Sequence, residues 1–287
     1  MEGLINYYTN LPEGEGGGGV KITEQPSLYD HLEKKSIAEI LSGINAEDKK
    51  VALAIEKALP EIEKLVTRIV PRMEQGGRIF YVGAGTSGRL GVLDASEIPP
   101  TFGMPNTLVI GLIAGGDHAL RNPVEKAEDN MAAGWNDLQA YHINEKDTLI
   151  GIAASGTTPY VVGALREARQ HGVLTASISS NPASPIAQEA DIAIEMIVGP
   201  EYVTGSSRMK SGTGQKMILN MITTATMIKL GRVKGNRMVN MQLTNAKLVD
   251  RGTRMVMDEL KLDYEQAQRL LLLHGSVKKA VEAYGKN

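Results

Sequence analysis

Four stretches rich in Ser, Thr and Gly stand where apolar runs of the sequence end, and their hydroxyl and amide donors are suited to holding a phosphate. The first reads GAGTSG from Gly83 to Gly88 and leads into a helix-like segment, so its amides are expected at a helix N-terminus, where anions bind. Any single member is explained as an ordinary turn or capping residue. Four such stretches together indicate a phosphate site with these candidate contacts: Gly85, Thr86, Ser87, Ser155, Gly156, Thr157, Thr158, Ser179, Ser206, Ser207 and Lys210.

The first stretch also fits the G-x-G-x-x-G pattern of dinucleotide-binding proteins. That interpretation needs an acidic residue at the end of the second strand. Here the next apolar run, Leu108 to Ile113, ends in Ala-Gly-Gly, and Asp117 follows only inside the loop. The sequence therefore favours a terminal phosphate over a nicotinamide cofactor. A tight turn whose glycines serve only packing stays open as the alternative.

The elements that must position these stretches are five apolar runs, spaced so that a crossover helix fits between consecutive ones. They are Ile79–Val82, Leu108–Ile113, Thr148–Ala153, Leu174–Ser179 and Ile192–Met196. This order predicts an α/β fold, a parallel sheet with helices on both faces. Because loops at the carboxyl ends of parallel strands meet at one crevice, the hydroxyl-rich turns are expected to face one pocket.

The segments around the sheet define the expected domain organisation. Residues 1–20 are glycine-rich and predict a flexible lead-in, and residues 21–70 predict N-terminal helices, the longer one capped at Asn45 and kinked or divided at Pro60. Residues 71–232 contain the sheet. Residues 233–287 predict a small helical extension without a core of its own, with helices over Met238–Met257, from Asp263 and from Ser276.

Composition excludes several classes of function. The chain has 287 residues, a net charge of −2 and no Lys/Arg cluster, which argues against a nucleic-acid surface. It contains no Cys, which excludes disulfides, thiolate nucleophiles and zinc–cysteine sites and is compatible with a reducing cytosol. The five histidines are scattered without metal-ligand spacing, so no metal is expected, although His118 follows the second strand and is a candidate substrate contact. No signal peptide or membrane span is visible.

Four longer stretches resemble a known family: FYVGAGTSGRLGVLDASEIPPTFG, GLIAGGDHALRNPVEKAEDN, GIAASGTTPYV and VTGSSRMKSGTGQKMILNM. They are similar to the N-acetylmuramic acid 6-phosphate etherases of the sugar-isomerase (SIS) domain superfamily, from about Thr23 to the end of the chain. The resemblance implies a Rossmann-like three-layer αβα sandwich with a five-stranded parallel sheet, a homodimer, and a cytoplasmic lyase without metal or other cofactor. The implied reaction removes D-lactate from C3 of N-acetylmuramate 6-phosphate and, after water is added, leaves N-acetylglucosamine 6-phosphate.

The same resemblance carries over two catalytic glutamates. The family's D-A-S-E and A-E-D motifs are intact and place its proton donor at Glu97 and its second functional glutamate at Glu128. Such a reaction needs one group to take the C2 proton and one to protonate the lactate oxygen, and two carboxyls with different pKa values suffice. Glu97 is expected in a short helix beside Pro99 and Pro100, partly desolvated and therefore protonated. Without the motifs, both glutamates would be interpreted as solvated surface residues.

Two other functions stay open on the same fold. Glucokinase regulatory protein resembles this family and binds without turnover, and aldose–ketose isomerases share the fold. The intact glutamate motifs favour turnover over sensing, and elimination over isomerisation. One departure from the family lies at Thr23–Ser27, which differs from the usual Thr-Glu-x-x-Asn-Pro pattern. Arg208 and Lys210 are the cations expected near the bound anion; the alternatives are that they neutralise Glu201 or hold the loop to the sheet.

Overall fold

The computed structural model describes residues 21–124, 126–243 and 245–285, so the expected lead-in at residues 1–20 lies outside the described residues. Its centre is a five-stranded parallel sheet with the strand order β2-β1-β3-β4-β5. The strands are β1 Ile79–Gly83, β2 Val109–Ile113, β3 Thr148–Ile152, β4 Leu174–Ser179 and β5 Ile192–Glu195. Each agrees with an expected apolar run to within one residue at either end, which confirms the predicted sheet.

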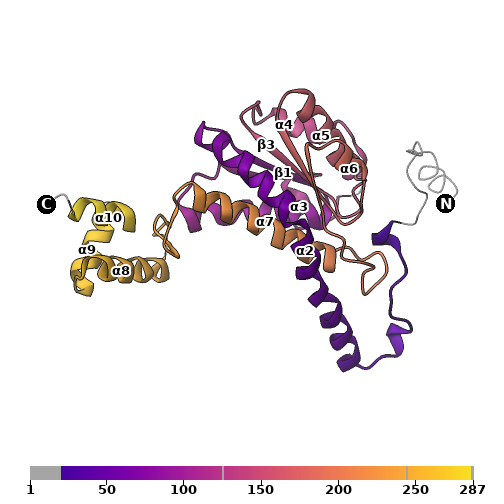
Figure 1. Cartoon of the computed structure of the whole chain (residues 1–287), viewed down its shortest axis with the longest axis horizontal. Helices are drawn as coiled ribbons and strands as arrows, with labels where there is room; N and C mark the ends of the chain where they lie inside the picture. The colour runs from indigo at the N-terminus through magenta and orange to yellow at the C-terminus, as the bar shows by residue number, and fades with distance from the viewer. Residues whose placement is uncertain (1–20, 125, 244, 286–287) are drawn as a thin grey trace.

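Helices cover both faces of the sheet, as Figure 1 shows. Alternate strand residues point to opposite faces. Ile79 and Tyr81 belong to a core shared with α2, α3 and α7, while Phe80 and Val82 belong to a second core shared with α4, α5 and α6. The helices are α2 Ile37–Glu74, α3 Gly85–Phe102, α4 Ala133–Gln139, α5 Pro159–Gln170, α6 Pro185–Gln188 and α7 Lys210–Lys229. This is the three-layer αβα sandwich that the sequence predicted. Four short 3-10 helices complete this part: η1 Ile22–Glu24, η2 Leu32–Lys34, η3 Asp117–Leu120 and η4 Ala127–Asp129.

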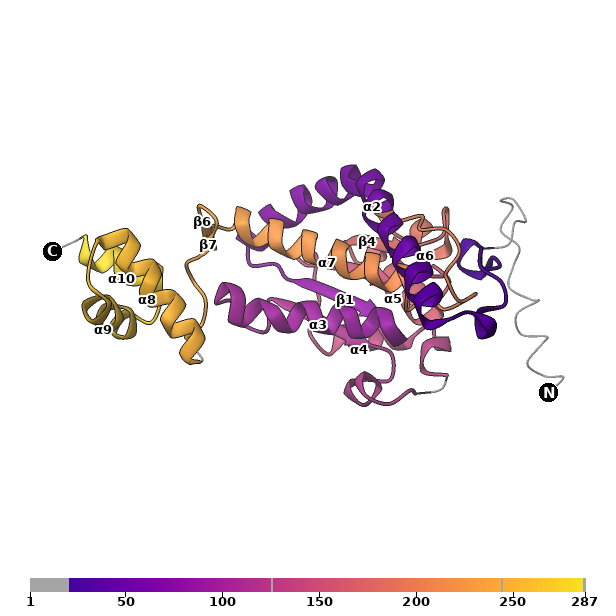
Figure 2. The ribbon, with the colours of Figure 1, turned by 90° about the horizontal axis from the view of Figure 1, so that it is seen from below.

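The long helix α2 differs from the expectation. It runs unbroken through Pro60 and begins after Ser36, which forms a capping box with Glu39, so Asn45 lies inside the helix and caps nothing. A proline inside a helix removes a hydrogen bond and favours a bend, and α2 is visibly bent in Figure 2. The helix nevertheless continues because an apolar stripe from Val51 to Met73 packs into the first core on both sides of the proline.

The C-terminal part extends away from the sheet at the end opposite the N-terminal segment (Figures 1 and 2). A hairpin of β6 Val233–Lys234 and β7 Arg237–Met238 leads to α8 Ala246–Leu260, α9 Tyr264–His274 and α10 Val277–Tyr284. The helix expected from Met238 starts only at residue 246, since the side chain of Asn245 accepts the amide of Leu248 as its cap. The caps at Asp263 and Ser276 are confirmed.

This C-terminal unit has its own core, contrary to the expectation. Its buried apolar side chains form a cluster separate from the two cores of the sheet: Val239, Met241, Met255, Val256, Ala267, Leu271, Val277 and Ala280. The sequence did not reveal this core because each of the helices α8, α9 and α10 has only a short apolar stripe. The cluster forms because the three helices pack on one another. None of the helices within the described ranges is long and apolar enough to span a membrane.

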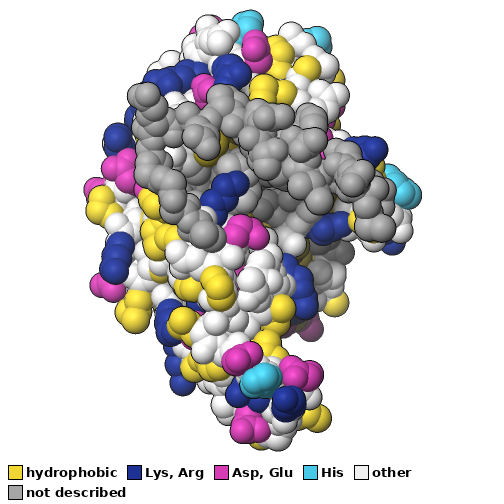
Figure 3. Space-filling model, turned by 90° about the vertical axis from the view of Figure 1, so that its right-hand side faces the viewer, with side chains coloured by type: hydrophobic (Ala, Val, Ile, Leu, Met, Phe, Trp, Pro, Cys, Tyr) yellow, Lys and Arg dark blue, Asp and Glu magenta, His cyan; other side chains and the backbone are white. Residues whose placement is uncertain are grey.

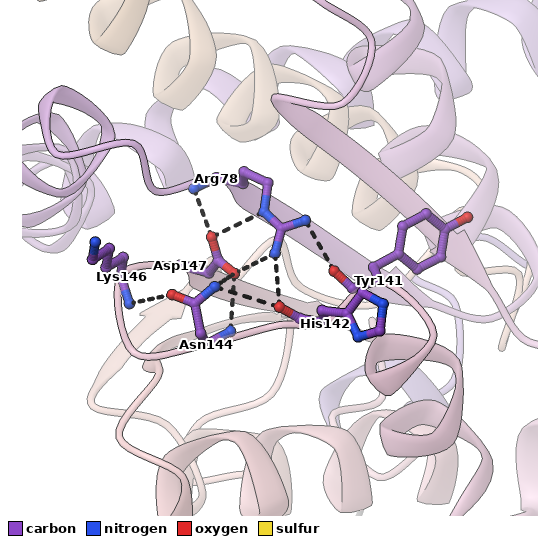
Figure 4. Close-up of polar contacts among 6 residues, drawn as sticks. All are labelled: Arg78, Tyr141, His142, Asn144, Lys146 and Asp147. Atoms are coloured by element: carbon purple, nitrogen blue, oxygen red, sulfur yellow. Dashed lines mark hydrogen bonds and ion pairs between the residues drawn. The ribbon is translucent and has the colours of Figure 1, made fainter.

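An ion pair between the partly exposed Arg78 and the buried Asp147 fixes the amino ends of the central strands (Figure 4). Asp147 accepts hydrogen bonds from the Arg78 amide at 2.8 Å and from the Arg78 guanidinium at 2.7 Å and 3.1 Å. The same guanidinium donates to the carbonyl oxygens of Tyr141 and His142 at 3.0 Å and 3.1 Å. Arg78 and Asp147 directly precede β1 and β3, so the pair sets the register of the centre of the sheet, at the edge away from the hydroxyl-rich turns.

Candidate active site

The topology places the hydroxyl-rich turns after β1 and β3 side by side. β1 and β3 are neighbours, with Gly83 opposite Ile152 at their carboxyl ends, while β2 lies on the other side of β1. The chain therefore leaves the sheet in opposite directions at this point, which is where open α/β sheets bind ligands. Helices α3 and α5 both begin at these carboxyl ends of β1 and β3.

The turn after β1 combines packing glycines with free amide donors. A Cβ atom on Gly88 would lie 2.7 Å from the Gly83 carbonyl oxygen, so these two glycines allow the close approach of strand and helix. Gly85 has a φ of +51°, which favours glycine. The amides of Gly85, Thr86 and Ser87 have no hydrogen-bond partner among the described residues. Packing therefore explains Gly83 and Gly88, while the unpaired amides at the start of α3 are compatible with the predicted anion site.

The turn before α7 lies against the first one. A Cβ atom on Gly212 would be 3.4 Å from the Thr86 methyl group, and Ser87 donates a hydrogen bond to the Gln215 side chain at 2.9 Å. The Gln215 amide nitrogen is buried and has no partner among the described residues. Sequence reasoning missed Gln215, whose only signal is its place one turn after Ser211 in the TGSSRMKSGT segment. Ser206 and Ser207 are half-buried in this turn.

Lys210 is committed to a buried ion pair rather than to the open turn. Its ammonium lies 2.6 Å from the Glu47 carboxylate of α2, and the two side chains are 1% and 2% exposed. Glu47 also accepts from Lys50 at 2.6 Å and from the Tyr29 hydroxyl at 3.1 Å. The first amides of α7, those of Lys210 and Ser211, donate to the buried Glu201 carboxylate at 2.8 Å and 2.9 Å. A carboxylate of the chain itself therefore occupies the N-terminus of α7.

The turns after β3 and β4 contact each other. Ser155 accepts from the Thr157 hydroxyl at 3.1 Å, and Gly156, with a φ of +73°, packs on Ser184. Ser155, Thr157 and Thr158 are half-buried at the start of α5 and accessible to a ligand. Ser179 is fully buried and donates to the Asn181 carbonyl oxygen at 3.0 Å. Ser179 therefore shapes its turn, and the structure gives no support to the expected direct contact with substrate.

Glu97 stands far from these turns. α3 is 18 residues long rather than short, and Glu97 comes twelve residues after Gly85, about 18 Å along the helix axis. Its side chain is exposed beside Leu93, so the expected desolvation is absent within the single chain. Glu97 lines a hollow of about 270 Å³ with Asp94, Lys216 and Asn220. It also borders a second hollow with Lys247 and Arg251 of the C-terminal unit.

The buried carboxyl of the DASE motif is Asp94, which sequence reasoning did not single out. It accepts hydrogen bonds from Asn220 at 2.7 Å, Tyr81 at 3.1 Å and Thr223 at 3.3 Å. Burial raises the pKa of Asp94, and the three hydrogen bonds reduce that rise. Asp94 therefore joins α3 to β1 and α7 one helical turn before Glu97.

Glu128 is exposed in η4, and the adjacent Ala127 packs into the second core. Glu97 follows Ala95, which packs into the first core. Within one chain, the two motif glutamates thus belong to segments on opposite faces of the sheet, and the structure does not bring them together. His118 and Arg208 are both exposed, in η3 and in the turn before α7.

Comparison with known proteins decides the family. The chain is 74% identical to the N-acetylmuramic acid 6-phosphate etherase of Bacteroides fragilis, over 96% of this chain and 98% of that one. The chain belongs to the N-acetylmuramic acid 6-phosphate etherases. It is also 73% identical to the etherase of Porphyromonas gingivalis, over 92% of this chain and 96% of that one. The etherase family shown by these relatives is the one that the sequence motifs resemble.

Family models and solved structures agree with the fold of this etherase family. Residues 61–169 match the N-terminal SIS domain of glucokinase regulatory protein, and residues 130–225 match the SIS domain. The solved structure of the E. coli CFT073 protein c3406 superposes with a TM-score of 0.53 at 18% identity. The match covers 70% of this chain and 94% of that one. At this identity the likeness shows the fold alone.

Proposed function

We propose that this chain cleaves the lactyl ether at C3 of N-acetylmuramate 6-phosphate, giving D-lactate and N-acetylglucosamine 6-phosphate. The observation that carries the proposal is the 74% identity, over nearly the whole chain, to an etherase of this name. The intact DASE and AED motifs support it, because they supply the two carboxyls that elimination requires. The absence of cysteine is in keeping with the cytoplasm as the proposed compartment.

The phosphate is proposed to bind at the carboxyl ends of β1 and β3. Support comes from the free amides at the start of α3 and from the accessible hydroxyls of Ser155, Thr157 and Thr158 at the start of α5. Thr86 and the Ser206–Ser207 turn border the same point. Two helix N-termini and several hydroxyl groups directed at one point suit a dianionic phosphate monoester. Among the described residues, no three His, Asp or Glu side chains gather where they would hold a metal ion.

The reaction proceeds by elimination and then hydration. One carboxylate removes the C2 proton beside the open-chain aldehyde, the C3–oxygen bond breaks, and a second carboxyl protonates the departing lactate oxygen. Water then adds at C3 and a proton returns to C2, so that the atoms balance. Glu97 is assigned the role of the acid and Glu128 that of the base.

The separation of the two glutamates supports a homodimeric site. Glu97 is about 18 Å along α3 from the turn after β1, whereas a hexose phosphate is far shorter. Glu128 is exposed in η4, whose Ala127 packs on the other face of the sheet. In the homodimer that we propose, the α3 helices of the two copies run antiparallel with their exposed Leu93 and Glu97 faces towards each other, so that Glu97 of one copy lies towards the N-terminus of the other copy's α3. We therefore assign Glu97 of one copy and Glu128 of the other to a single active site.

The test begins with lactate release from N-acetylmuramate 6-phosphate by the parent enzyme. Glu97→Gln is expected to block lactate release and still exchange the C2 proton with deuterium from solvent, because the aldehyde stabilises the enolate without the acid. Glu128→Gln is expected to suppress that exchange. Glu63→Gln, an exposed glutamate on α2, serves as the control. Lactate release at the parental rate by Glu97→Gln would exclude the acid role, and the opposite exchange pattern would reverse the two assignments.

Mixing the two inactive variants tests the shared site. If each site takes one glutamate from each copy, one of the two sites in every mixed dimer is intact. Random subunit exchange then restores roughly a quarter of the parental activity. If both glutamates come from the same chain, no site in the mixture is complete and activity stays absent.

A further inference from the structure

The N-terminal segment 21–27 lies across the carboxyl ends of the strands that carry the candidate phosphate turns. Ser27 donates its hydroxyl to the Tyr202 carbonyl oxygen at 2.7 Å, and its amide donates to the Thr204 hydroxyl at 2.9 Å. Both partners follow β5. Figure 1 shows this segment beside the same end of the sheet, and Figure 3 views the molecule from that side. On the visible part of that face, Lys and Arg side chains are interspersed with Asp and Glu rather than gathered in one patch.

A reciprocal pair of hydrogen bonds fixes this segment to the turns. The Thr23 amide donates to the Asn181 side-chain oxygen at 3.3 Å, and the Asn181 amide donates back to the Thr23 hydroxyl at 3.0 Å. The same Asn181 amide donates to the Ser155 carbonyl oxygen at 3.1 Å. Thr23 is 2% exposed, so this contact belongs to the packed interior of the fold. It ties the N-terminal segment to the two turns after β3 and β4 at once.

The Thr23–Asn181 contact holds Lys21 beside the hydroxyls proposed to bind phosphate. The Lys21 ammonium donates to the Thr157 hydroxyl at 3.3 Å, and that hydroxyl contacts Ser155 at 3.1 Å. An ammonium has three donors, so two stay available to a second acceptor. Lys21 is exposed and has no carboxylate partner among the described residues. Glu24 is the nearest acid on the segment, and its carboxylate is turned to the Thr23 hydroxyl at 3.4 Å and to Gly205.

Two other cations near the turns are already engaged. Lys210 is buried against Glu47, and Arg89 of α3 donates to the carbonyl oxygens of Leu120 and Ala119 at 2.9 Å and 2.7 Å. Arg208 is exposed before α7 and makes no side-chain hydrogen bond or ion pair within the described part of the chain. A dianionic phosphate at the Ser155–Thr158 turn therefore meets the Lys21 ammonium first.

We propose that Lys21 is a substrate-binding residue that supplies the positive charge for the phosphate, and that Thr23 is the positioning residue that holds it there. The proposal rests on the proposed function, and it makes the N-terminal segment part of the active site. It also makes Lys21 a specificity determinant, since an ammonium at this place binds a phosphorylated sugar more tightly than the free sugar. A point charge close to a phosphate contributes roughly tenfold in affinity when partly screened by solvent.

The experiment compares Lys21→Met, Lys21→Arg and the control Lys34→Met, an exposed lysine of η2 that follows the segment 21–27 in the chain. Lys21→Met is expected to raise KM for N-acetylmuramate 6-phosphate roughly tenfold, with kcat within about twofold of the parent. Inhibition by N-acetylglucosamine 6-phosphate should weaken by a similar factor, while inhibition by unphosphorylated N-acetylglucosamine should not change. Lys21→Arg should restore most of the loss, because it keeps the charge, and Lys34→Met should behave as the parent.

A double-mutant cycle tests the positioning role. Thr23→Val should raise KM in the parent and have no further effect in the Lys21→Met background. Parental KM and inhibition constants in Lys21→Met would overturn the proposal, as would a weakening that is equal for the phosphorylated and the free sugar. If the parent released no lactate, the proposed function would fail. Calorimetry of inorganic phosphate binding to the parent and to Lys21→Met would still decide the role of Lys21.

Discussion

Replacing Lys210 by Met separates a structural role of this residue from a direct role in binding phosphate. Its ammonium lies 2.6 Å from the Glu47 carboxylate, and both side chains are almost fully buried. Removing one partner of a buried pair leaves an uncompensated charge, which costs about 3–5 kcal/mol. Glu47 keeps Lys50 and Tyr29 as partners, which places the expected loss at the lower end of this range. A loss of this size lowers the melting temperature by roughly 10 °C.

The assay is urea and thermal unfolding of three variants, followed by measurement of KM at a temperature at which all are folded. Lys50→Met is the control, because its side chain is half-exposed in its pair with Glu47 and such pairs contribute less than about 1 kcal/mol. The double variant Glu47→Met/Lys210→Met should recover most of the lost stability, since apolar residues of similar volume replace a buried pair at little cost.

Two results would contradict a purely structural role of Lys210. If Lys210→Met unfolds like the parent and raises KM tenfold, the ammonium binds phosphate, as its place in the TGSSRMKSGT segment had suggested. A double variant that is less stable than Lys210→Met alone would also contradict the reasoning, because it would mean that Glu47 stabilises the fold even without Lys210.

Four further outcomes follow from the contacts described. Ser155→Ala should raise KM at least several-fold, since a lost hydrogen bond to a charged group costs roughly 1.5–3 kcal/mol; unchanged KM values for alanine variants in all the proposed turns would exclude the phosphate site. Prolonged EDTA treatment should leave lactate release intact, and loss restored by one divalent ion would reveal a metal site. Asp147→Ala, at the amino edge of the sheet, should cost about 1–3 kcal/mol of stability with an unchanged KM, because the partly exposed Arg78 guanidinium keeps water and two carbonyl oxygens as partners; a raised KM would show coupling across the sheet. Burial alone would raise the pKa of Glu47, but the hydrogen bonds from Lys210, Lys50 and Tyr29 outweigh burial and lower that pKa. The stability that this carboxylate contributes should therefore persist down to a pH of about 4 and be lost below it. If the stability of Glu47→Gln fell with pH in the same way as that of the parent, this assignment would be wrong.

The sheet was predictable because its three central strands, β1, β3 and β4, are buried on both faces and all five strands stand out as continuous apolar runs. The convergence of the turns after β1 and β3 followed from topology alone. The ion pair of Lys210 could not be predicted, because its partner Glu47 is 163 residues away in the chain and no local sequence pattern marks the pairing. The predicted break at Pro60 was wrong for a related reason. The local preference of proline to end a helix is outweighed by the packing of α2 against elements distant in the chain. Glu97 was expected to be buried from its apolar neighbours, but on a helix those neighbours point elsewhere, and Asp94, three residues earlier, takes the buried position.

The packing of α2 on α7 has a consequence for how the chain is made. The apolar stripe of α2 is complete once residue 73 has been synthesised, but α7, which covers part of it, ends only at Lys229. A ribosome that adds about 5–20 residues per second needs roughly 10–30 s to cover that interval. During this time the 38-residue amphipathic helix of the nascent chain lacks the cover of α7, and its apolar stripe stays partly exposed, as in the binding sites that chaperones recognise.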